Sequence, residues 1–173
     1  MTSVGSEHVE AAVSEMTRVL MPHADADWQV QAGSLKWNCW ETAAHVAHDL
    51  VAYAGQVAGG ATVSYLPFDL VVAPSPPREV LEVVAACGRL LSVVVEHADP
   101  ETVAWHWGMS DAAGFAAMGV GETLAHSRHF AGSWRELATP GISEPTCRRP
   151  STAHAAARPR LRCSALGHRQ SGS

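Results

Sequence analysis

The sequence contains no uncharged apolar run close to the roughly 20 residues that a membrane-spanning helix needs, so no transmembrane segment is predicted. Residues 1–13 show no basic region followed by an apolar stretch, and no secretory signal is expected. The four cysteines form no CxxC pair, which argues against a cysteine zinc site and against a disulfide framework. We therefore expect a cytoplasmic protein that does not bind membranes.

Basic residues are also scarce over most of the chain. Residues 1–133 hold 5 basic and 15 acidic residues, a net charge of −10, which argues against binding to nucleic-acid phosphates. Residues 134–173 hold 7 arginines and 2 acidic residues, a net charge of +5. This second segment is rich in Pro, Ser and Ala and has no apolar periodicity, so we expect a disordered tail. One hypothesis for its different character is a shifted reading frame near residues 133–140.

The remaining sequence is sufficient for one domain with a single core, over residues 5–133. Four segments repeat apolar residues at helical spacing, and a further segment, residues 61–75, is compatible with a short strand or an extended loop. We expect an all-α four-helix bundle with long connections. Ser6 and Asp111 are the expected N-caps of the first and last helices. The four segments are residues 6–21, 40–57, 76–97 and 111–131.

The last predicted helix carries the residues with the clearest chemistry. Phe115, Met118, Gly119, Glu122 and His126 fall on one face, and its first members are apolar, so Glu122 and His126 are expected to point toward the core. A buried carboxylate is costly unless it is paired or bound to a metal. The pair is therefore a candidate for two metal ligands. Two alternatives remain: a simple Glu–His hydrogen bond in a shielded pocket, or a helix rotated so that both residues face water.

A third ligand has to come from another helix, and the second predicted helix offers His45, His48 and Asp49. These three residues lie on one broad side of that helix. Three nitrogen or oxygen ligands with an open position suit catalytic zinc, nickel or ferrous iron. The spacing alone does not choose among the three candidates, and each histidine is also compatible with a surface or hydrogen-bonded position.

Two further histidines have alternative interpretations. His129 extends the face of His126 and is either an additional ligand, a supporting residue or general base, or an exposed residue near the helix end. His106 lies between Trp105 and Trp107 and either packs in an aromatic cluster or lines the mouth of a cavity.

Two segments resemble the N-terminal, metal-binding domain of mycothiol-dependent maleylpyruvate isomerases, in the DinB-like superfamily of four-helix bundles. In the first, Trp37 is followed eight residues later by His45 in the stretch HVAHDL, similar to the family's HLADDL-like helix. In the second, residues 110–126 (SDAAGFAAMGVGETLAH) are similar to the family's core helix with its E-x-x-x-H pair. The resemblance covers about residues 5–132.

The resemblance implies that His45, Glu122 and His126 bind a divalent metal, usually zinc. Counting eight residues from Trp40 instead would select His48. It also implies a bound small-molecule thiol, mycothiol, and a small electrophilic substrate, hence a thiol-dependent isomerase or S-transferase. The alternative function is a non-catalytic module that binds a metal or small ligand, and a further alternative is a helical bundle with no metal.

The chain departs from the family at two places. Relatives often continue after the last histidine with an aspartate, as in HTHDIA, whereas this chain has residues 127–130, SRHF. An acidic group that supports the ligands would then be missing. Nothing in the sequence matches the C-terminal domain that contributes to the isomerase active site. The sequence predicts neither a specific substrate nor an oligomeric state.

Overall fold

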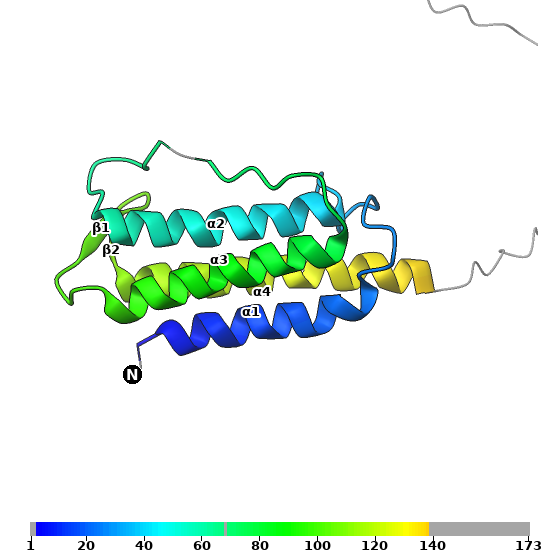
Figure 1. Cartoon of the computed structure of the whole chain (residues 1–173), viewed down its shortest axis with the longest axis horizontal. Helices are drawn as coiled ribbons and strands as arrows, with labels where there is room; N and C mark the ends of the chain where they lie inside the picture. Colours follow the sequence, from blue (N-terminus) through cyan, green and yellow to red (C-terminus); the bar gives the residue numbers. More distant parts are fainter. Residues whose placement is uncertain (1–2, 68, 139–173) are drawn as a thin grey trace, which may run out of the picture. The chain divides into compact units, whose positions relative to one another are not determined.

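The computed structural model describes residues 3–67 and 69–138, and these residues are predominantly helical, as the all-α prediction expected (Figure 1). Residues 139–173, which include most of the predicted tail, lie outside the described part. No described helix has both the length and the apolar composition that a membrane crossing requires. The elements, in chain order, are α1 (Ser6–Leu20), the 3-10 turn η1 (Met21–His23), α2 (Cys39–Gly59), α3 (Pro77–His97), β1 (Val103–Trp105), β2 (Met109–Asp111) and α4 (Ala112–Ala138).

The ends of the helices follow local capping chemistry. Asn38 caps α2, because its side chain accepts a hydrogen bond from the Glu41 amide while the Glu41 carboxylate accepts one from the Asn38 amide. Asp111 caps α4 as predicted, with its carboxylate accepting from the Gly114 amide at 2.7 Å. The prediction for α1 was wrong by one residue. Gly5, not Ser6, holds the cap position, and its amide donates to Nδ1 of His8.

The four helices lie side by side, and their apolar faces meet in one core (Figure 1). Helices α1 and α2 each contact both α3 and α4. The apolar residues at helical spacing on α1 and α2 are buried, as the periodicity required. They are Val9, Val13, Met16 and Leu20 on α1, and Val46, Leu50, Tyr53 and Val57 on α2. On α3 the apolar residues at helical spacing include Leu90, but Leu90 is 51% exposed, whereas Leu81 is fully buried. The helix is rotated so that Leu81, Val84 and Leu91 face the core, which turns Leu90 toward solvent.

Helices α2 and α4 approach closely beside the candidate ligands. A Cβ atom added at Gly119 would lie 2.6 Å from Cδ2 of Leu91 and 3.3 Å from Cδ2 of Leu50. Glycine at this position therefore lets α4 lie against α2 and α3 one turn before Glu122.

Two parts of the chain differ from the sequence prediction. Residues 100–111 were expected to be a connection between two helices, but residues 103–111 form an antiparallel hairpin in which Ala104 pairs with Ser110. Helix α4 ends at Ala138, beyond the predicted end at Ala131. Its last turns are held by the loop before α2, since the Ser133 hydroxyl accepts from the Gly33 amide and donates to the Gln31 carbonyl. The described residues of 61–75 form no strand, so of the two predicted alternatives the structure has the extended loop.

Candidate metal centre

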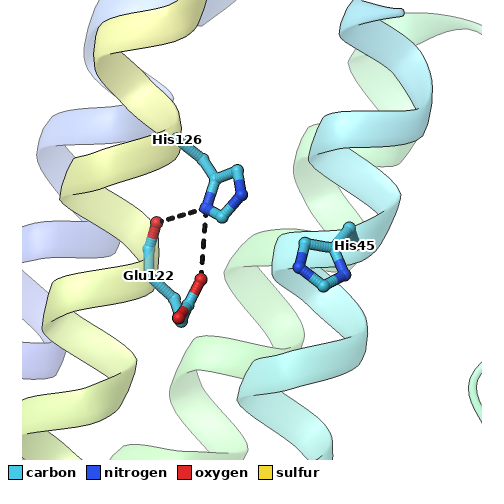
Figure 2. A group of neighbouring side chains, drawn as sticks. All are labelled: His45, Glu122 and His126. Carbon is cyan, nitrogen blue, oxygen red and sulfur yellow. Dashed lines mark hydrogen bonds and ion pairs between the residues drawn. The ribbon is translucent and has the colours of Figure 1, made fainter. Parts of the chain in front are cut away.

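Three predicted ligands come together between α2 and α4. His45, Glu122 and His126 each offer one donor atom, and these three atoms lie within 4.8 Å of one another. Figure 2 shows Glu122 and His126 projecting from α4 on the side of α2, which carries His45. All three side chains are partly buried. The structure thus selects the core-facing interpretation of the Glu122–His126 pair and rejects the rotation that would expose it.

The imidazole of His126 is held by its own helix. Its Nδ1 atom lies 2.9 Å from the Glu122 backbone carbonyl and 3.3 Å from Oε2 of the same residue (Figure 2). A carbonyl oxygen can only accept, so Nδ1 carries the proton and donates it. Nε2 is then the atom that remains free to bind a metal. A hydrogen bond to the opposite ring nitrogen is the usual way in which proteins orient a histidine ligand.

His45 is positioned by contacts on two sides. Its ring packs against the Trp37 indole, with ring centroids 4.5 Å apart, and faces the His126 ring at 5.2 Å. Its Nε2 atom also lies 3.3 Å from Oδ2 of Asp49, one turn later on α2. The contact with Trp37 links the two residues whose spacing distinguished His45 from His48 in the sequence.

Asp49, on α2, is a partly buried acidic residue that lies beside His45. The sequence offered it as a ligand, but the structure places it beside a ligand instead. Burial raises the pKa of its carboxyl, while His45 opposes that shift and Glu122 adds to it. A partly buried carboxylate next to an imidazole holds the orientation of that imidazole and favours a bound cation at the site.

The two other histidine candidates lie outside the cluster. Nδ1 of His48 is 2.9 Å from Oδ1 of Asp69 and 3.2 Å from the Leu70 amide, so this imidazole faces the connection after α2. His129 is partly buried, and its ring centroid is 6.2 Å from that of His126. The backbone and ring of His129 lie against Gly33, so this α4 residue packs against the loop before α2.

A cavity of about 530 Å³ opens beside the cluster. Its walls come from α2, from the loop after α2, from the hairpin tip and from α4. His106 lines it and also packs edge-on against the rings of Tyr53 and Phe115, so this residue both lines a cavity and belongs to an aromatic cluster. Sequence reasoning did not identify Tyr65 or Gln56, because no local pattern links the loop at residue 65 to the hairpin. The lining residues are His48, Asp49, Ala52, Tyr53, Gln56, Tyr65, Leu66, His106, Trp107 and Glu122.

The far wall of the cavity is fixed by one buried amide. Gln56 is 2% exposed, and its Nε2 donates to the Trp105 carbonyl at 2.9 Å while its Oε1 accepts from the Leu66 amide at 2.8 Å. These bonds join α2 to both the loop and the hairpin. Next to them, the Tyr65 hydroxyl lies 2.8 Å from Nδ1 of His106. Hydrogen bonds therefore connect the segments that form the walls of the cavity and hold them in place.

The donor set fits a divalent metal. Two imidazole nitrogens and one carboxylate oxygen are the donors of catalytic zinc sites that keep an open position, and they also suit nickel and ferrous iron. Tetrahedral zinc would place donors about 3.3 Å apart, so small side-chain rotations must close the cluster around the ion.

No known family model, curated protein or solved structure matches this chain. The case for a metal centre at His45, Glu122 and His126 therefore rests on their geometry and donor chemistry.

Proposed function

We propose that this protein binds a divalent metal, most simply zinc, through His45, Glu122 and His126. We also propose that its helices form a DinB-like four-helix bundle similar to the metal-binding domain of mycothiol-dependent maleylpyruvate isomerases. The observation that carries the proposal is the convergence of three donor atoms within 4.8 Å, from two helices far apart in sequence. The contact between Asp49 and His45 supports it, because metal-binding imidazoles characteristically have a carboxylate neighbour.

The proposed activity is that of a thiol-dependent isomerase or S-transferase acting on a small electrophile. A metal at this site would lower the pKa of a coordinated thiol, so that thiolate exists at neutral pH. The nucleophile would come from a small molecule such as mycothiol. Among the described residues, the two cysteines, Cys39 and Cys87, are buried, and burial raises the pKa of both thiols. The cavity of about 530 Å³ beside Glu122 has the size of a small-molecule site.

The bond changes balance without an oxidant or a reductant. In the addition, a sulfur–carbon bond forms, one π bond of the electrophile breaks, and the proton that the thiol gave up passes to the substrate. In isomerisation the sulfur–carbon bond breaks, the π bond re-forms in the other geometry and the proton returns to sulfur. In S-transfer the bond to a leaving group breaks instead, and the leaving group departs with the proton.

The decisive experiment is metal analysis by mass spectrometry on protein purified without chelator. We expect about one metal ion per chain, and its loss in His126→Ala. His97→Ala is the matched control, because His97 is an exposed histidine at the end of α3 and lies outside the cluster. Absence of metal in the unchanged protein, together with no rise in melting temperature when zinc is added, would overturn the proposal.

The activity is tested separately, by thiol-dependent turnover. Zinc-loaded protein is incubated with mycothiol or a simpler thiol and a panel of small electrophiles. Product that requires both thiol and metal, and that is lost in Glu122→Gln, supports an enzyme. Stoichiometric metal with no turnover over the whole panel would instead favour the alternative function, a non-catalytic module that holds a metal or small ligand.

A further inference from the structure

The cavity beside the metal cluster has an unusual combination of walls. Three aromatic side chains line it, Tyr53, Tyr65 and Trp107, and two carboxylates, Asp49 and Glu122, line the end near the cluster. Among the described residues that line it, none is Lys or Arg. The faces of aromatic rings attract cations, and a carboxylate beside the rings adds its own attraction for a cation.

Trp107 is held at this cavity in a strained backbone conformation. Its φ angle is 55°, in the region that favours glycine, and its side chain is 82% exposed although it lines the cavity. A hydrogen bond from the His106 amide to the Gly108 carbonyl closes the turn around it. An exposed indole kept at positive φ is costly in free energy, and such strain concentrates at ligand sites.

The tyrosines contribute neutral rings and not phenolates. Burial raises the pKa of Tyr53 and of Tyr65, and the neighbouring Asp49 raises both further. At neutral pH these side chains therefore present aromatic surface and hydroxyl groups. Apart from the imidazoles of His48 and His106, the ionisable side chains of fixed sign among the described lining residues are the two carboxylates.

We propose that this cavity binds a small organic cation, an ammonium group on an aromatic or aliphatic body, with the charge between Asp49 and the rings of Tyr53, Tyr65 and Trp107. The inference rests in part on the proposed function, because it names the ligand class of the cavity that adjoins the metal site. It narrows the small electrophilic substrate that the isomerase resemblance implies to one that carries a positive charge.

The preference for a cation persists when the metal is bound. A divalent ion offsets the charges of Glu122 and Asp49, so the wall becomes neutral and still offers no Lys or Arg to a ligand carboxylate. Residues 1–133 have a net charge of −10, and their field repels a dianion and attracts a cation. Without metal, the two carboxylates strengthen the same preference.

The test compares three benzyl compounds of similar size by isothermal titration calorimetry on the full chain. The probes are benzyltrimethylammonium, benzyl alcohol and phenylacetate, measured both with chelator and after loading with zinc. A quaternary ammonium cannot coordinate zinc, so its binding reports on the cavity. We expect benzyltrimethylammonium to bind at least roughly tenfold more tightly than either other probe. With chelator present, equal binding of all three, tighter binding of phenylacetate, or no binding of the cation would overturn the proposal. After zinc loading the comparison is with benzyl alcohol, because the carboxylate of phenylacetate can itself coordinate zinc.

Variants locate the bound cation. With chelator present, Asp49→Asn is expected to weaken ammonium binding roughly fivefold and to leave benzyl alcohol unchanged. Glu82→Gln removes an equal charge from an exposed position on α3 outside the cavity, and it should have little effect. Trp107→Leu should also weaken binding, whereas Trp107→Phe should retain most of it. Because Trp107 is so exposed, these two variants test the cavity without risk to the core. Equal ammonium binding by Trp107→Leu and Trp107→Phe would show that an aromatic ring at position 107 does not contribute to the site.

The outcome also separates this proposal from the metal proposal. Zinc at one ion per chain with no ammonium binding leaves the metal centre intact and rejects the ligand class. Ammonium binding by a protein that takes up no zinc would support the ligand class and reject the metal centre.

Discussion

Nε2 of His45 lies 3.3 Å from Oδ2 of Asp49, one turn further along α2, and this contact places a carboxylate directly beside a proposed metal ligand. The side chain of Asp49 is only 18% exposed, so water screens the interaction weakly. The arrangement makes Asp49 a positioning residue for His45, and it gives the first prediction.

Asp49→Asn keeps the shape of the side chain and removes its charge. We expect zinc affinity to fall by roughly tenfold or more, because the imidazole loses the carboxylate that supports it. Competition with a chelating dye measures the change. Asp69→Asn is the control, since Asp69 contacts His48 outside the cluster. Equal losses in both variants would show a general effect of charge and would reject the role given to Asp49.

A pair of histidine variants distinguishes the two candidate ligands on α2. His45→Ala should abolish stoichiometric zinc binding, whereas His48→Ala should retain about one ion per chain, because His48 faces Asp69 and Leu70. Metal analysis of both proteins, with melting curves to verify folding, provides the measurement. Retention of zinc by His45→Ala and its loss in His48→Ala would reverse the assignment.

Two glycines of α4 are expected to respond in opposite directions to the same substitution. Gly119→Ala inserts a Cβ that would lie 2.6 Å from Leu91, so it should lower the free energy of unfolding by about 1–3 kcal/mol. At Gly121 a Cβ meets nothing within 4 Å, and Gly121→Ala should raise that energy by roughly 0.5–1 kcal/mol through helix propensity. Urea unfolding curves compare the two. Stabilisation by Gly119→Ala would mean that α4 does not approach α2 and α3 as described.

The buried thiols give a dependence on pH. Burial raises the pKa of Cys39 and Cys87, so both stay protonated in the folded chain while an unfolded thiol ionises near about 8.5. The folded state then holds more protons above that pH. The stabilisation is complete below the unfolded pKa and is lost as pH rises through it toward the folded value.

We therefore expect slow alkylation of both cysteines by iodoacetamide between about pH 7.5 and 9, since the thiolate is the reactive form. We also expect a lower melting temperature at the upper end of that range. Peptide mapping by mass spectrometry follows each site, and urea-unfolded protein supplies the reference rate. Alkylation of Cys39 at the unfolded rate would contradict the burial described for it.

The sequence by itself determined where most of the helices form and which faces they bury. Apolar residues at helical spacing were sufficient to place α1, α2 and α3 to within a few residues, since burial of one face is what stabilises a surface helix. The sequence also placed Glu122 and His126 on one core-facing stripe of α4. Two residues four apart share a helical face whatever the rest of the fold does.

Only the tertiary structure decided what lies opposite that face. The choice of His45 over His48 depends on how α2 is rotated against α4, which no spacing along α2 can specify. The extension of α4 depends on Ser133 meeting the loop at Gln31 and Gly33. The cavity depends on Gln56 joining the Trp105 and Leu66 backbones. Each of these outcomes is a contact between distant segments, and its energy exists only once packing has brought the partners together.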